Sequence, residues 1–250
     1  MSELKTISVL DVPINPLSMK DTLQCLTSRL DNKEKTFVIT ANAEIIMLGQ
    51  KNPAYMNLLQ KAELVLPDGA GTVWAGRTLG NIVPERVAGF DLFLELIKLS
   101  AEKHYKIFFF GSAPGVAEAA REKCESFAPG VKIVGIHNGY FTEAESEEIV
   151  AQINKSGANI LFAALGAPKQ EFWLEKFAPA IKADLYMGIG GSFDVLAGKM
   201  ARAPKWIQEA SLEWLFRLYK QPSRFIRMLV LPCFVIKVLQ HKYSPKKLDK

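Results

Sequence analysis

The feature that most constrains the fold is a regular alternation of short apolar runs with helical patterns in the second half of the chain. Strand-like apolar runs begin near Lys106, Val131, Ala158 and Asp184, with amphipathic patterns between them. The spacing of about 26 residues, together with strands that are apolar throughout, is typical of βαβ units in a sheet that is covered on both faces. The pattern predicts an α/β fold of the Rossmann-like, doubly wound type, with a mainly parallel sheet and helices on both faces.

Two earlier apolar runs each end in a cluster of polar residues. Residues 37–39 are followed by Thr40-Ala-Asn42, and residues 64–66 by Pro-Asp68-Gly. The carboxyl ends of parallel strands meet at the edge where open α/β sheets bind ligands, so we expect a hydroxyl, an amide and a carboxylate on one rim. Simpler interpretations remain open, because Thr and Asn commonly cap helices and Pro-Asp-Gly is a common turn.

The later strands end in glycine-containing turns. Glycine allows the backbone to approach a ligand closely, and the N-terminus of the helix that follows offers N–H groups to an anion. None of these turns has the G-x-G-x-x-G or Walker A spacing, so a nicotinamide-dependent oxidoreductase is only weakly supported. The turn residues predicted to line a binding site are Gly111, Ser112, Gly166, Gly190 and Gly191.

Four further polar residues have no distinctive spacing. Gln170 and Glu171 begin a helical pattern, where solvated residues of the first turn are the simplest interpretation. Asp194 follows Gly-Gly-Ser-Phe and is either a helix cap or a ligand contact. Arg86, in Pro-Glu-Arg-Val, cannot be distinguished from a surface arginine by spacing alone.

The sequence contains no recognisable metal motif. Its three histidines and three cysteines are scattered, so neither a zinc site nor a disulfide framework is indicated, and a reduced compartment is expected. An Asp-x-Asp pair that could hold a divalent ion against a diphosphate is also absent. Any diphosphate chemistry would therefore rely on arginine, lysine or helix N-termini. The N-terminus lacks the apolar run of a signal peptide, which favours a cytoplasmic location.

The positive charge is concentrated at the end of the chain. Residues 202–250 contain 11 Lys/Arg against 3 Asp/Glu, whereas residues 1–201 contain 20 against 23. We therefore predict an α/β domain over 1–201 and a basic helical appendage over 202–250. The appendage mixes basic with aromatic residues and contains an apolar run, 228–239, which is too short to span a ~30 Å hydrocarbon core. Peripheral binding to an anionic membrane is the preferred interpretation; a solvated basic helix, a nucleic-acid patch and an oligomer contact are the alternatives.

Several motifs together resemble one protein family. They are Thr40-Ala-Asn-Ala-Glu44, Leu66-Pro-Asp-Gly69, Pro84-Glu-Arg-Val-Ala-Gly-Phe-Asp91, Gly166-Ala-Pro-Lys-Gln-Glu171 and Gly190-Gly-Ser-Phe-Asp-Val-Leu-Ala-Gly198. Their order is that of the WecG/TagA/CpsF glycosyltransferases, glycosyltransferase family 26, and the tail is most similar to that of the TagA members.

The resemblance implies an inverting transfer of N-acetylmannosamine from its UDP derivative to undecaprenyl-diphosphate-linked N-acetylglucosamine, as in wall teichoic acid synthesis. It implies that Asp68 is the general base and that no metal or cofactor is needed. By the same resemblance Thr40, Asn42, Arg86 and Gln170 bind the sugar and diphosphate. An appendage that closes over the site at the inner face of the membrane would contribute Arg217, Arg224 and Arg227.

Alternatives to this assignment remain at the level of the sequence. The donor could instead be the UDP-linked mannosaminuronate or UDP-glucose, which relatives use. A nucleotide-dependent oxidoreductase would bind NAD(P), and a membrane scaffold without catalytic activity would bind lipid without turnover. No nucleic-acid partner is expected, and the apolar tail could form a homo-oligomer where no membrane is present.

Overall fold

The computed structural model describes residues 4–210, 212–220 and 225–244. Its strands are β1 (Ile7–Val9), β2 (Val12–Ile14), β3 (Thr36–Ala41), β4 (Leu64–Pro67), β5 (Lys106–Gly111), β6 (Lys132–His137), β7 (Ile160–Ala164) and β8 (Leu185–Gly188). Its helices in the α/β part are α1 (Met19–Asp31), α2 (Ala43–Lys51), α3 (Pro53–Lys61), α4 (Ala70–Thr78), α5 (Gly89–Lys103), α6 (Val116–Phe127), the 3-10 turn η1 (Glu143–Glu145), α7 (Ser146–Ser156), α8 (Lys169–Phe177) and α9 (Ser192–Leu196). The helices that follow are α10 (Lys205–Glu209), α11 (Glu213–Lys220), α12 (Phe225–Met228) and α13 (Val230–Tyr243).

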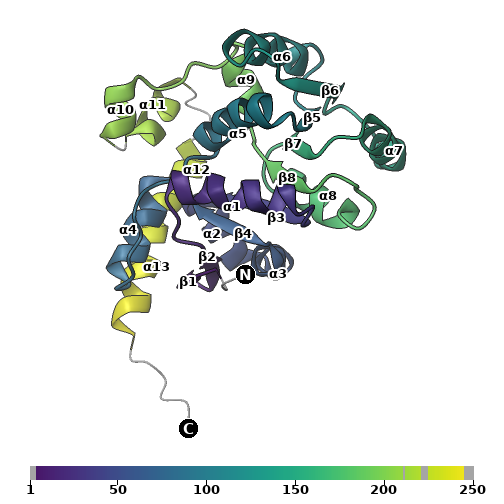
Figure 1. Cartoon of the computed structure of the whole chain (residues 1–250). Helices are drawn as coiled ribbons and strands as arrows, with labels where there is room; N and C mark the ends of the chain where they lie inside the picture. Colours follow the sequence, from purple (N-terminus) through teal and green to yellow (C-terminus); the bar gives the residue numbers. More distant parts are fainter. Residues whose placement is uncertain (1–3, 211, 221–224, 245–250) are drawn as a thin grey trace.

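The predicted parallel sheet is confirmed. Six strands lie in the order β4-β3-β8-β7-β5-β6, and every neighbouring pair is parallel. The chain first builds β3 and β4, crosses to β5 and β6, and then returns through β7 to β8 in the centre (Figure 1). In this order β3 and β8, the first and last strands of the six-stranded sheet along the chain, are neighbours, so their carboxyl ends lie side by side.

Successive strand residues point to two separate cores. Phe109 and Phe162 face the core that includes α1, α5, α6 and α9, where Phe93 of α5 meets Phe162 edge-on at 4.9 Å between ring centroids. Phe108 and Phe110 face the core that includes α2, α3, α7 and α8. Both faces of the sheet are therefore covered, which explains why the strands are apolar throughout.

The first described residues form a β-hairpin. β1 and β2 pair antiparallel as a two-stranded sheet of their own. Asn15, just after β2, donates its backbone N–H to the carbonyl of Val65 and accepts the Val65 N–H on its side-chain oxygen, at 2.7 and 2.8 Å. The hairpin thereby satisfies polar backbone groups of β4, the edge strand of the large sheet.

The last helix packs onto the α/β part. In Figure 1, α13 lies beside α4, and its contacts extend to α2. Phe234 and Val238 are fully buried in the same core as α2, so much of the apolar run that suggested a membrane partner is explained by packing. Other residues of that run, such as Leu229 and Ile236, are exposed. Among the described residues, no helix is both long and apolar enough to cross a membrane.

Candidate active site

A cleft of about 270 Å³ lies at the carboxyl ends of β3, β4, β7 and β8. We call it the strand-end cleft. The strand order reverses at this point of the sheet, so the connections that leave neighbouring strands diverge and a crevice forms between them. In doubly wound folds such a crevice is the usual ligand site. The structure brings together here seven of the residues singled out from the sequence: Thr40, Asn42, Asp68, Gly166, Gln170, Gly190 and Gly191.

Asn42 both caps a helix and lines the cleft. Its side-chain oxygen accepts the N–H of Ile45 at 3.0 Å, which is the N-cap bond of α2. With the oxygen held in this way, the amide NH₂ is the part of Asn42 that remains to face the cleft. Thr40 lies opposite Gly89, where an added Cβ would come within 2.7 Å of the threonine hydroxyl oxygen. Glycine at position 89 therefore leaves space for that hydroxyl.

Asp68 is held at the rim by the backbone around it. Its N–H donates to the carbonyl of Ala41 at 3.0 Å, so the ends of β3 and β4 are tied together. Thr72 donates its hydroxyl to the same carbonyl at 2.9 Å. Gly69 then adopts a φ of +84°, a conformation that favours glycine, and turns the chain into α4. The turn interpretation of Pro-Asp-Gly is thus correct, and the turn presents a carboxylate to the cleft.

The expectation that Gln170 and Glu171 are solvated is wrong. They are only 5% and 3% exposed, because the first turn of α8 faces the sheet rather than the solvent. The Gln170 side-chain oxygen accepts the N–H groups of Gly166 and Gly190, at 3.2 and 3.0 Å, and its NH₂ donates to Glu171 at 2.7 Å. Burial raises the pKa of the Glu171 carboxyl, which favours its neutral form.

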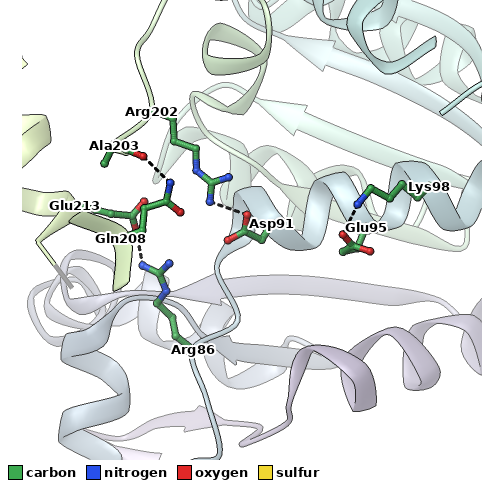
Figure 2. A network of polar contacts seen from close by, with 8 residues as sticks. All are labelled: Arg86, Asp91, Glu95, Lys98, Arg202, Ala203, Gln208 and Glu213. Carbon is green, nitrogen blue, oxygen red and sulfur yellow. Dashed lines mark hydrogen bonds and ion pairs between the residues drawn. The ribbon is translucent and has the colours of Figure 1, made fainter. Parts of the chain in front are cut away.

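Arg86 lies beside the strand-end cleft rather than in its lining. It lines a larger cleft of about 1030 Å³ between α4 and α10, which we call the α4–α10 cleft. Arg86 forms an ion pair with Glu213, at the start of α11, and Glu213 itself lines the strand-end cleft (Figure 2). Arg86, which the resemblance implies to be a binding residue, therefore connects the two clefts through Glu213.

A second ion pair, Arg202–Asp91, lies near the first. Arg202 donates to Asp91 at 2.6 Å and lies 4.6 Å from the ring centroid of Phe90. Arg202 lines both clefts. Next to it, the side chain of Gln208 donates to the carbonyl of Ala203 at 2.6 Å (Figure 2). Two ion pairs thus connect Glu213 to Arg86, in the segment between α4 and α5, and Arg202 to Asp91, in the first turn of α5.

Sequence reasoning did not identify Arg202 or Glu213 as parts of the site. Neither belongs to a short motif, and pairing between distant segments leaves no local pattern. The available signal for Glu213 is its sign, since it is one of only 3 acidic residues in the basic segment 202–250.

Besides Arg86, three predicted residues lie outside the lining of the strand-end cleft: Gly111, Ser112 and Asp194. Ser112 donates to the Asp194 carboxylate at 3.3 Å, so these two side chains bind each other across the loop after β5 and the start of α9. An added Cβ at Gly111 would approach the Ala164 carbonyl oxygen at 2.4 Å, so glycine there allows close packing of the strands.

Of the tail arginines, Arg224 lies outside the described residues. Arg217 falls in α11 and Arg227 in α12, but their side chains are not part of the description.

The site offers a carboxylate next to cationic groups. Asp68 and Arg202 both line the strand-end cleft, and Arg86 lines the α4–α10 cleft. A carboxylate can accept a proton from an attacking hydroxyl, and guanidinium groups bind phosphate oxygens in pairs. Within the described ranges, no three His, Cys, Asp or Glu side chains are grouped as metal ligands.

A doubly wound sheet with a polar cleft at the strand ends and arginines beside it defines a nucleotide-type α/β protein. The chain belongs to the glycosyl transferase WecG/TagA/CpsF family, whose model matches residues 7–248. It is 35% identical over 241 residues to the N-acetylglucosaminyldiphosphoundecaprenol N-acetyl-beta-D-mannosaminyltransferase of Bacillus spizizenii, covering 94% of this chain and 93% of the relative. Proteins of the same name from Bacillus subtilis and Staphylococcus aureus are 34% and 29% identical, over 87% and 98% of this chain and 84% and 97% of their own lengths.

Proposed function

We propose that this protein transfers N-acetylmannosamine from a UDP donor to N-acetylglucosaminyl-diphospho-undecaprenol, with inversion at the anomeric carbon. The observation that carries the proposal is the convergence of Thr40, Asn42, Asp68 and Gln170 on one cleft, in a chain similar over nearly its whole length to transferases named for this reaction. The product would be a β-1,4-linked disaccharide on the lipid carrier.

In this mechanism Asp68 acts as the general base. Its carboxylate accepts the proton of the acceptor hydroxyl while that oxygen bonds to the anomeric carbon and the bond to UDP breaks. Assistance of this kind contributes about 10²- to 10⁴-fold to the rate. The half-buried position of Asp68, on a turn fixed by the Ala41 carbonyl, would keep the carboxylate in place during the reaction.

The departing diphosphate requires positive charge. Arg202 lines the strand-end cleft and Arg86 pairs with Glu213 of its lining, so both are candidates, and each forms an ion pair with a carboxylate. A substrate diphosphate could replace the Glu213 carboxylate on Arg86, since both offer oxygen acceptors to a guanidinium group. Arg217, Arg224 and Arg227 remain proposed contributors from the tail, and the reaction is proposed to need no metal.

The C-terminal segment is proposed to bring the site to the membrane surface. Large exposed side chains gather on α10, α11 and α12, among them Trp206 at 67%, Tyr219 at 78% and Phe225 at 59% exposure. Aromatic and basic residues together suit the headgroup region of an anionic membrane, where the lipid-linked acceptor resides. We propose a peripheral association with the inner face of the cell membrane.

The test is a transfer assay with radiolabelled UDP-sugars and a polyprenyl-diphosphate N-acetylglucosamine acceptor. We expect turnover with UDP-N-acetylmannosamine, and Asp68→Asn should lower the rate by about 10²- to 10⁴-fold while UDP binding stays within a few-fold. The surface variant Asp31→Asn is the matched control. An Asp68→Asn enzyme with near wild-type turnover would exclude Asp68 as the general base. If the enzyme prefers another UDP-sugar, that sugar replaces UDP-N-acetylmannosamine as the proposed donor.

A further inference from the structure

Two neighbouring buried side chains, Gln170 and Glu171, form a polar cluster in the lining of the strand-end cleft. Their position on α8 places them under the loops that follow β7 and β8. Those loops contain Gly166 and Gly190, both with positive φ, at +78° and +53°. Loops of this kind have little side-chain packing of their own, so their positions depend on hydrogen bonds.

Gln170 supplies the hydrogen bonds that join the two loops. Its side-chain oxygen accepts one backbone N–H from each, and both acceptor directions of that oxygen are therefore occupied. Its NH₂ is packed against Gly188, where an added Cβ would come within 2.4 Å of the amide nitrogen. The amide is thus fixed from three sides, and Glu171 is the residue that accepts from its nitrogen.

The Glu171 carboxyl group is held between two neighbours. It accepts from the Gln170 NH₂ at 2.7 Å, and the buried Tyr55 hydroxyl of α3 faces it from the other side. Only 3% of Glu171 is exposed, and burial disfavours the charged form of its carboxyl group. A neutral side chain of similar shape would avoid that desolvation cost, so the glutamate is better explained by the hydrogen bond that it accepts from Gln170.

We infer that Glu171 is a positioning residue which, through the Gln170 amide, holds together the two glycine loops that form one wall of the strand-end cleft. The effect on turnover rests on the proposed function, whereas the effect on the loops does not. Without an acceptor at position 171, the Gln170 NH₂ would turn toward cleft water and the oxygen would release the Gly166 and Gly190 N–H groups.

The decisive variant is Glu171→Met, which keeps the shape but removes both carboxylate oxygens. We expect kcat/KM for transfer to fall about 10- to 100-fold, the scale on which small displacements of a cleft wall act. The free energy of unfolding is measured alongside, so that the loss of turnover is read from protein that is fully folded. Glu175→Met, one turn later on α8, is the matched control and should leave kcat/KM unchanged. A folded Glu171→Met with wild-type turnover would overturn the inference.

Action through Gln170 is tested by a double-mutant cycle. Once Gln170→Ala has removed the amide, adding Glu171→Met should change kcat/KM less than about 3-fold, since the effect of residues that act as a unit is not additive. Two effects that multiply would show that Glu171 acts on its own. Glu171→Gln retains an acceptor oxygen and should restore turnover to within about 3-fold of wild type; a loss as large as that of Glu171→Met contradicts the role.

Hydrogen exchange separates this inference from the proposed reaction. The amides of Gly166 and Gly190 should exchange faster in Glu171→Met than in wild type, without any substrate present. Unchanged exchange would overturn the inference even if the protein is confirmed as a mannosaminyltransferase. Faster exchange in a protein that transfers no N-acetylmannosamine would refute the proposed function and leave the positioning role standing.

The pH dependence of stability provides a second check. Burial raises the pKa of Glu171 above its ordinary value of 4.5, so the proton is bound more tightly in the folded chain than in the unfolded one. The free energy of unfolding of wild type should therefore fall relative to that of Glu171→Gln as the pH rises above about 4.5. Tyr55 faces Glu171 from α3, and burial raises its pKa, so it does not titrate in this range. Glu44 and Asp68 of the same cleft are present in both variants and cancel.

Discussion

The strand-end cleft and the C-terminal segment are built on different physical principles. The cleft is formed by strand ends and buried hydrogen bonds, with Gln170 and Asp68 held by backbone groups. The described contacts between residues 202–220 and the rest of the molecule include two ion pairs, Arg202–Asp91 and Arg86–Glu213, whose side chains are all 20–35% exposed. Partly exposed pairs are worth about 1 kcal/mol or less, whereas a buried hydrogen-bonded scaffold opens only with the whole domain.

This difference assigns the two regions different tasks. A general base must stay within hydrogen-bond reach of the reacting hydroxyl, which suits a rigid sheet edge. On the proposed function, residues 202–220 bind lipid and the departing diphosphate and must exchange partners, which suits contacts that are individually weak. The last helix of the predicted appendage 202–250, α13, shares the rigid kind of packing, because Phe234 and Val238 belong to the α/β core.

The largest effect is expected where the C-terminal segment behaves like the core. Phe234→Ala removes a fully buried ring of α13 that packs against α4. A Cβ added at Gly71 of α4 would lie 3.7 Å from the Cε1 atom of this ring. We expect the free energy of unfolding to fall by about 3 kcal/mol, measured by urea denaturation. Val235→Ala, on the exposed side of the same helix, should cost under about 0.5 kcal/mol. A loss below about 1 kcal/mol for Phe234→Ala would show that α13 detaches independently, and the contrast between α13 and residues 202–220 would disappear.

The sequence predicts the cleft better than it predicts the C-terminal segment. Strand hydrophobicity and the position of polar clusters after strands placed Thr40, Asn42 and Asp68 together, because a parallel sheet brings its carboxyl ends to one edge by geometry alone. Glu171 was misjudged because the exposure of a first helical turn depends on which face meets the sheet. Arg202 and Glu213 were missed because their partners are 111 and 127 residues away.

The smallest effect is expected at Glu213. Its substitution tests whether the substrate diphosphate replaces the Glu213 carboxylate on Arg86. Glu213→Gln should change the free energy of unfolding by less than about 1 kcal/mol, as for other partly exposed pairs. It should also free Arg86, so UDP is expected to bind a few-fold tighter at low ionic strength. The gain should shrink as added salt screens the guanidinium group. Isothermal titration with UDP at two salt concentrations measures the gain in UDP affinity and its dependence on salt.

A suitable control removes an ion pair without touching the clefts. Glu95→Gln breaks the Glu95–Lys98 pair on α5, which lies along the helix away from Arg86 (Figure 2). It should leave UDP affinity unchanged at either salt concentration. Weaker UDP binding in Glu213→Gln would mean that Glu213 holds Arg86 in its binding position instead of competing with the diphosphate. The ion pair would then be part of the rigid cleft, because a partner that orients the guanidinium group has no reason to leave when the donor arrives.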